Sequence, residues 1–223
     1  AVLISGHEGV AINVWDYGGR GPALLLCHCT GTLGRIWEPV AALLGGHFRV
    51  LAVDARGHGD SGQPAQRLDC AWEHSGHDLL AVIDALGLGS GLWAAGHSGG
   101  AAHVAYAEYL RPGTFSRVAL IDAIIGAREI FSGEAPLAHT ARRRKDLFLD
   151  RESARARLGS KPPMCTWTPE TLDAYVAHGL ADLPGGMLTL KCPKEVEAWN
   201  YELGGACEVF EHFSELQFEA LII

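Results

Sequence analysis

The sequence predicts an α/β fold with a mostly parallel sheet and helices on both of its faces. The first observation is that short apolar runs, typical of buried strands, alternate with helical patterns through the first half of the chain. The second is that one run, residues 92–97, ends at a glycine-flanked serine and continues at once as a helix over 101–110. Strands that alternate with helices in this way pair in parallel.

The individual strands and helices follow from local patterns. Residues 10–17 alternate in polarity as a half-buried strand does, and the glycines and proline of 18–22 end it. Residues 23–27 are apolar throughout, which fits a strand that is covered on both faces. The other elements expected in this half are buried strands at 49–54 and 118–122 and helices at 36–44 and 72–86.

The pattern changes after residue 126, where helices are expected with no buried strand between them. Thr168 suits an N-cap, and Pro169 suits the first position of a helix that extends to about residue 178. A helical insertion behind the serine-bearing strands is typical of a lid over a pocket. The expected divisions are a core over 1–126, a helical lid over 127–207 inserted after the sixth strand, and the start of the C-terminal part of the core over 208–223. The lid is expected to include a helix at 193–203, and the last division a strand at 218–223.

The composition excludes several function classes. A formal net charge of −8 argues against a nucleic-acid-binding surface, and no apolar stretch approaches the length of a membrane span. The six cysteines lack the paired spacing of a metal site and the density of a disulfide scaffold. Cys27 and Cys29 flank His28, but consecutive strand residues point to opposite faces. We therefore expect free thiols and a cytoplasmic protein that needs no metal or other cofactor.

Ser98 has the surroundings of a catalytic nucleophile. An abrupt strand-to-helix turn strains the backbone of the turn residue, and glycines at 96 and 100 avoid collisions on either side. The hydroxyl is then held above the carboxyl end of the sheet, with the Gly99 amide beside it to receive an oxyanion. Glycine is abundant, at 28 of 223 residues, so a chance match is the alternative. Ser98 is nevertheless the only serine with glycines at both positions, and it lies between a strand and a helix.

Three motifs in chain order resemble the α/β-hydrolase superfamily, in its capped branch. They are His-Cys-Thr-Gly at 28–31, Asp-Ala-Arg-Gly-His-Gly-Asp-Ser-Gly at 54–62, and Gly-His-Ser-Gly-Gly at 96–100. The resemblance covers essentially the whole chain and implies that Thr30 supplies the second oxyanion amide beside Gly99. Cys29 departs from the family, which has glycine there. The 54–62 motif implies a loop that shapes the site.

The resemblance also implies a catalytic acid and then a histidine after the serine. Residues 218–223 look like the strand before the usual acid, so we expect a chain truncated before both partners. Asp122 is the one acid at a place that some family members use, and many members carry a noncatalytic aspartate there. An aspartate at a strand end also caps loops, so both interpretations stand.

The histidines do not reveal the base. His97 is expected at the pocket but pointing away from the Ser98 hydroxyl, and His28 is expected to line the oxyanion loop. Three more, His139, His178 and His212, lie in or near the expected lid, and no motif distinguishes one of them.

The expected function of the intact protein is hydrolysis of a small ester or related acyl substrate through an acyl-enzyme at Ser98. Carbon–carbon bond hydrolysis and perhydrolysis are alternatives on the same scaffold, and a serine at 98 argues against epoxide or haloalkane chemistry. A binding protein that retains an incomplete hydrolase site is the alternative from another class. We expect the 223-residue chain alone to be almost inactive and to self-associate through an exposed sheet edge.

Overall fold

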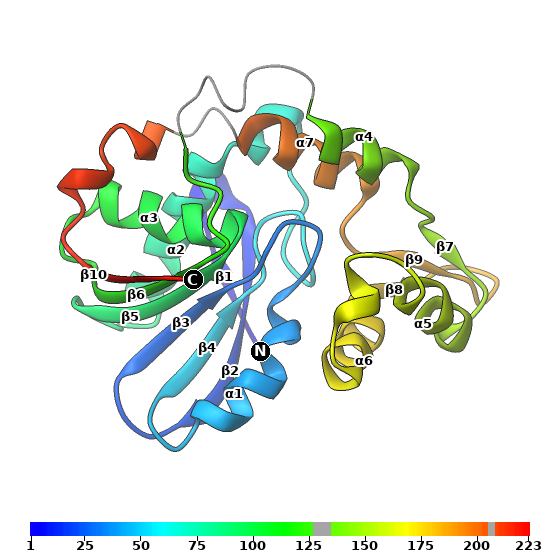
Figure 1. Ribbon diagram of the computed structural model, residues 1–223, viewed down its shortest axis with the longest axis horizontal. Coiled ribbons are helices and arrows are strands. Elements are labelled where there is room, and N and C mark those ends of the chain that lie inside the picture. Colours follow the sequence, from blue (N-terminus) through cyan, green and yellow to red (C-terminus); the bar gives the residue numbers. More distant parts are fainter. Residues whose placement is uncertain (127–134, 205–207) are drawn as a thin grey trace.

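The computed structural model describes residues 1–126, 135–204 and 208–223. Its main sheet has seven strands in the order β1-β2-β4-β3-β5-β6-β10 (Figure 1). The strands from β4 to β10 are parallel, whereas β1 and β2 form an antiparallel hairpin at one edge. The strand bounds are Val2–Ser5 (β1), Ala11–Gly19 (β2), Ala23–Cys27 (β3), Arg49–Val53 (β4), Leu92–His97 (β5), Phe115–Ile121 (β6) and Glu219–Ile222 (β10).

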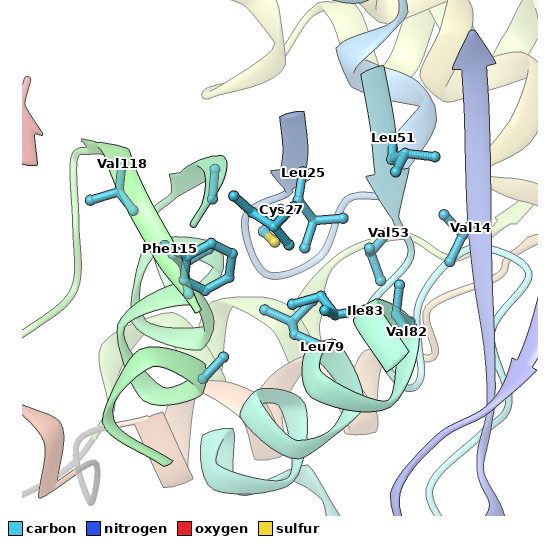
Figure 2. Packing of buried hydrophobic residues seen from close by; sticks show 14 of the residues in the cluster. Val14, Leu25, Cys27, Leu51, Val53, Leu79, Val82, Ile83, Phe115 and Val118 are labelled. Carbon is cyan, nitrogen blue, oxygen red and sulfur yellow. The ribbon is translucent and has the colours of Figure 1, made fainter. Parts of the chain in front are cut away.

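Helices cover both faces of this sheet, as the sequence predicted. The helices α2 (Trp72–Ala85) and α3 (Gly99–Leu110) pack on one face, and α1 (Glu38–Leu44) packs on the other. Figure 2 shows the larger core, in which Leu25 and Leu51 from the strands meet Leu79 and Ile83 from α2. Alternate residues of the same strands, such as Leu24, point to the α1 side. Because both faces are buried, these strands are continuous apolar runs.

The α1 face is only partly covered. Between α1 and strands β5, β6 and β10 lies a groove of about 480 Å³, whose lining includes Trp37, Trp93 and Leu221. Strand β10 is the outermost strand on this side of the described sheet, and Leu221 and Ile222 are 60% and 68% exposed. The predicted strand at 218–223 is thus present, with one long edge unpaired among the described residues.

The expectation of a lid without strands is wrong. Residues 135–204, called the cap below, contain a three-stranded antiparallel sheet in the order β7-β9-β8. Its strands are only two or three residues long, so their alternation is too short to register as a sequence pattern. Gly185 and Gly186, with φ of 87° and 83°, form the turn between β8 and β9. The cap elements are α4 (Pro136–Arg143), β7 (Leu147–Phe148), α5 (Arg151–Gly159), α6 (Pro169–His178), β8 (Leu180–Asp182), β9 (Leu188–Leu190) and α7 (Lys194–Gly204).

The cap helices that the sequence predicted are present. Thr168 caps α6, where its hydroxyl accepts from the Thr171 N–H at 3.4 Å, and Pro169 is the first helical residue. In Figure 1, α4 and α7 lie at the top and the rest of the cap extends to the right. The expected lid also included 127–134 and 205–207, which lie outside the described residues. Short 3-10 helices complete the fold at His7–Gly9 (η1), Gly34–Trp37 (η2), Arg67–Cys70 (η3), Met164–Thr166 (η5), Glu208–Phe210 (η6) and Phe213–Glu215 (η7).

None of the helices in the described ranges is both long and apolar enough to cross a membrane.

Candidate active site

Ser98 stands alone between the last residue of β5 and the first residue of α3. Its backbone has φ 54° and ψ −119°, a strained conformation for a residue with a side chain. Three backbone hydrogen bonds hold it there: the Ser98 N–H donates to the Ile121 carbonyl at 2.9 Å, and the Ser98 carbonyl accepts from the N–H groups of Ala101 at 3.1 Å and Ile124 at 3.4 Å. The structure therefore places this serine on the sharp strand-to-helix turn that the sequence predicted, half-buried at the carboxyl end of the sheet.

The two flanking glycines are required by close backbone contacts. A Cβ on Gly96 would lie 2.5 Å from the backbone N and Cα of Ala101. A Cβ on Gly100 would lie 2.5 Å from the carbonyl oxygens of both Cys27 and His28. Backbone cannot yield as a flexible side chain does, so these contacts leave no room for a larger residue. The expected crowding is present at both glycines. At Gly100 it comes from the backbone of Cys27, the last residue of β3, and of His28, which follows it.

Residues 28–32, called the oxyanion loop below, lie beside this turn. The Thr30 hydroxyl oxygen is 2.9 Å from the point where a Cβ on Gly99 would stand, so the two predicted oxyanion residues are neighbours. Within residues 1–126, 135–204 and 208–223, neither the Thr30 N–H nor the Gly99 N–H has a hydrogen-bond acceptor. Both amides are unpaired among the described residues, and their role as oxyanion donors stays a prediction.

The rest of the oxyanion loop is held by hydrogen bonds on its other polar groups. The Gly31 N–H donates to His58 Nε2 at 3.0 Å, and the Gly31 carbonyl accepts from the Tyr175 hydroxyl at 3.2 Å. The Thr30 carbonyl accepts from the Tyr201 hydroxyl at 3.5 Å. Because α6 and α7 carry the two tyrosines, the cap contributes directly to the shape of the loop.

His28 and His58 are buried, neutral supports. His28 Nε2 accepts from the Ala55 N–H at 2.9 Å, and its Nδ1 lies 2.9 Å from the Cys29 carbonyl, which fixes Nδ1 as the protonated nitrogen. Burial lowers the pKa of His28 to about 4. His58 has the same arrangement, with Nδ1 directed at the Arg56 carbonyl, and burial lowers its pKa to about 3. The two rings tie the oxyanion loop to the 54–62 loop, and both ring nitrogens of each are occupied.

Asp122 follows β6 and reaches the same edge of the sheet as Ser98. Its backbone φ is 44°, and its N–H donates to the Ile223 carbonyl at 2.8 Å. The side chain is exposed, and its carboxylate makes no hydrogen bond to another described residue. The negative charge of Asp122 acts on His97, but burial is the larger effect and the pKa of His97 is lowered overall. The role of Asp122 as catalytic acid stays a prediction.

The other histidines considered as bases have partners elsewhere or face solvent. His178 Nε2 lies 2.9 Å from the Arg35 guanidinium, across the contact between α6 and η2. His212 lies 2.9 Å from Glu215 and stacks on Tyr109, while His139 is exposed on α4. Among the residues that the structure describes, none of these imidazoles hydrogen-bonds to the Ser98 hydroxyl.

Sequence reasoning missed a buried polar cluster of the cap that faces the oxyanion loop. Arg144 pairs with Glu197 at 2.6 Å and donates to the Tyr175 hydroxyl at 3.3 Å. The Glu197 carboxylate lies 2.6 Å from the point where a Cβ on Gly31 would stand. Burial raises the pKa of Tyr175 to about 12, so its hydroxyl stays protonated and able to donate. The residues come from separate cap elements, and no local motif links them.

Sequence comparisons find hydrolases that match part of this chain. The epoxide hydrolase of Caballeronia sordidicola is 33% identical over 112 residues, which are 50% of this chain and 33% of that protein. The 3-oxoadipate enol-lactonase 1 of Acinetobacter baylyi is 29% identical over 89 residues, 40% of this chain and 32% of that protein. The matched segments thus span about a third of the length of these curated relatives.

Structural similarity extends over nearly the whole chain. The crystal structure of E-2-(acetamidomethylene)succinate hydrolase superposes with a TM-score of 0.81 at 21% identity, covering 99% of this chain and 78% of the other. At this identity the similarity establishes the fold. Residues 24–210 match the family model described as the alpha/beta hydrolase family, which is most of the chain and includes all three motifs. Together with the serine turn between β5 and α3, this match shows that the chain belongs to the alpha/beta hydrolase family.

Proposed function

We propose that this protein is a serine hydrolase that cleaves a small ester or related acyl substrate through an acyl-enzyme at Ser98. One observation carries the proposal. Ser98 is held at positive φ between β5 and α3, beside Gly99 and the Thr30 side chain that lies against it, and the N–H groups of Thr30 and Gly99 have no acceptor among the described residues. A nucleophile and two donors in this arrangement suit a reaction in which a carbonyl oxygen becomes negative.

The chemistry follows from these groups. A base takes the proton of the Ser98 hydroxyl, and Oγ forms a bond to the substrate carbonyl carbon. The carbonyl π electrons move to the oxygen, which then accepts from the Thr30 and Gly99 amides. Collapse of this intermediate expels the alkoxide, which takes a proton, and water later releases the acid from Ser98 by the same steps. Loss of one such donor costs on the order of 100- to 1000-fold in kcat.

The nucleophile favours acyl substrates over epoxides, although several relatives, including that of Caballeronia sordidicola, are named epoxide hydrolases. A carboxylate that opens an epoxide leaves an ester, which water can cleave. A serine hydroxyl that opens an epoxide leaves an ether on the enzyme, and a site with oxyanion donors cannot hydrolyse an ether. Attack on a carbonyl leaves a serine ester that water can cleave, so Ser98 supports turnover on esters, lactones and related acyl compounds.

A binding protein with an incomplete hydrolase site is the second candidate. The observation in its favour is that no histidine among the described residues hydrogen-bonds to the Ser98 hydroxyl. Without a base the serine keeps its proton at neutral pH, and removal of a triad member typically costs about 10⁴- to 10⁶-fold. We therefore expect residues 1–223 alone to turn over esters very slowly, even where the complete site is active.

Labelling and turnover distinguish the two candidates. A form of the protein that carries the complete site is treated with a fluorophosphonate, and mass spectrometry identifies the modified peptide, while p-nitrophenyl butyrate reports turnover. We expect modification at Ser98, loss of both signals in Ser98→Ala, and neither loss in the exposed control Ser90→Ala. Unchanged turnover in Ser98→Ala would contradict the proposal. Saturable binding of an ester without labelling or turnover would favour the binding protein.

A further inference from the structure

A second group of chemically active side chains lies outside the candidate active site, where the β1–β2 connection meets α2. His7 and Glu8 belong to η1, and His74 and His77 are one turn apart at the start of α2. The His7 ring is close to both, with ring centroids 5.1 Å from His74 and 4.5 Å from His77. Neither the family motifs nor the proposed chemistry uses these residues.

The side chains of His7, Glu8 and His74 bring their donor atoms to one point. His7 Nε2 lies 4.0 Å from one Glu8 oxygen, and His74 Nδ1 lies 3.7 Å from the other. One ligand atom from each residue lies within 4.8 Å of the others. In a tetrahedral zinc site with bonds of about 2.0 to 2.1 Å, ligand atoms are about 3.3 Å apart. Small side-chain rotations close the difference, since the Glu8 side chain is 55% exposed.

An unpartnered nitrogen independently points to a ligand. His74 Nδ1 is buried and has no hydrogen-bond partner in the described chain. A buried polar atom without a partner is costly, and native structures satisfy nearly all such atoms. A metal ion at the junction would coordinate this nitrogen. The His7 side chain is 34% exposed, which leaves a path for the ion from solvent.

The backbone that carries His7 is firmly held from behind. The His7 N–H donates to Asp78 at 2.8 Å, and the His7 carbonyl accepts from Arg56 at 3.3 Å. Asp78 and Arg56 form a buried ion pair at 2.7 Å, with the Arg56 side chain fully buried. His77 stacks on the His7 ring and restricts its orientation. The position of the first ligand is therefore set before an ion binds, as effective metal sites require.

We propose that His7, Glu8 and His74 bind a divalent first-row transition metal ion of the zinc type. Two imidazole nitrogens and one carboxylate oxygen suit zinc, whereas calcium and magnesium prefer oxygen ligands throughout. The fourth position is open to water. Coordination joins η1 to the first turn of α2. That turn also carries Trp72, whose ring lies 3.2 Å from the point where a Cβ on Gly99 would stand. The ion thus fastens the helix that packs against the serine turn.

The test is a titration of the EDTA-treated, dialysed protein with zinc chloride, followed by calorimetry and thermal unfolding. We expect one zinc per chain and a rise of roughly 5 to 10 °C in the unfolding midpoint at a hundredfold excess over Kd. His74→Gln and Glu8→Gln should each weaken binding at least tenfold. The exposed His47→Gln is the matched control and should bind as the wild type does.

Two further measurements separate this site from other zinc binders. Cobalt in place of zinc gives visible absorption, and a thiolate charge-transfer band would place the metal on a cysteine and overturn the proposal. The unfolding midpoints of all variants in EDTA should agree with the wild type, which shows that weaker binding is not a folding defect. Absence of binding, or binding that persists in both His74→Gln and Glu8→Gln, also overturns it. Neither result depends on Ser98, so the metal site can be disproved without disproving the proposed function, and the reverse also holds.

Discussion

We predict that three buried histidines, His28, His58 and His103, make the folded protein less stable as the pH falls. Burial lowers the pKa of His28 to about 4 and those of His58 and His103 to about 3. In an unfolded chain each titrates near 6.5. Between these values the unfolded state binds more protons than the folded state, so stability falls as the pH falls below about 6.5 and levels off near the folded pKa values.

The magnitude follows from the same values. On lowering the pH from 7 to 5, each histidine that stays neutral in the fold costs about 2 kcal/mol, and the three together cost about 6 kcal/mol. A domain of this size typically has a free energy of unfolding of about 5 to 15 kcal/mol, so the change is a large part of the total. His28 and His58 stay neutral in the folded protein at pH 5, so the hydrogen bonds through which they hold the oxyanion loop persist there, and under the proposed function ester turnover should fall only where the fold itself is lost.

Urea unfolding followed by tryptophan fluorescence at pH 7, 6 and 5 measures this loss. His103→Leu removes the one histidine of the three whose Nε2 has no partner, and it should reduce the loss between pH 7 and 5 by about 2 kcal/mol. The exposed His47→Leu is the control and should leave the pH dependence unchanged. Equal free energies of unfolding at pH 7 and 5 would refute the reasoning, as would an unchanged pH dependence in His103→Leu.

The other predictions concern the serine turn, the cap and the sheet edge. Gly100→Ala places a Cβ 2.5 Å from two carbonyl oxygens, so it should lower the free energy of unfolding, measured in urea, by at least about 1 to 3 kcal/mol and abolish ester turnover. The control Gly46→Ala has open space around its Cβ and should have neither effect. Tyr175→Phe removes a hydrogen bond to the oxyanion loop and should lower kcat with little change in KM; an unchanged kcat would count against the support given by the cap. We further expect concentration-dependent association through β10, which Leu221→Lys should reduce in sedimentation velocity and Leu43→Lys, on α1, should not.

The serine turn could be predicted because its determinants are local. A continuous apolar strand, a glycine two residues before the serine and another two after it lie within ten residues of chain. Each glycine meets backbone in the structure, so the sequence pattern has a direct steric cause. The same holds for α6, whose start was indicated by Thr168 and Pro169.

Features assembled from distant segments could not be predicted. The strands of the cap sheet are stabilised by pairing rather than by their own two or three residues. Arg144 meets Glu197 across 53 positions, and only the fold shows that the pair faces the oxyanion loop. The absence of a metal site was argued from cysteine spacing, which carries no information about His7 and His74. Their proximity depends on where α2 begins relative to η1.

The hydrogen bonds from Tyr175 and Tyr201 to the oxyanion loop couple α6 and α7 to the segment that holds the predicted donor Thr30. Under the proposed function, a cap that lifts α6 and α7 to admit a substrate would break both bonds and loosen the segment that presents the Thr30 amide. Under the proposed function, water that enters while the cap is raised meets a serine without its full set of donors. Substrate would then enter while the cap is raised, and Ser98 would react fastest only after α6 and α7 have returned to the oxyanion loop.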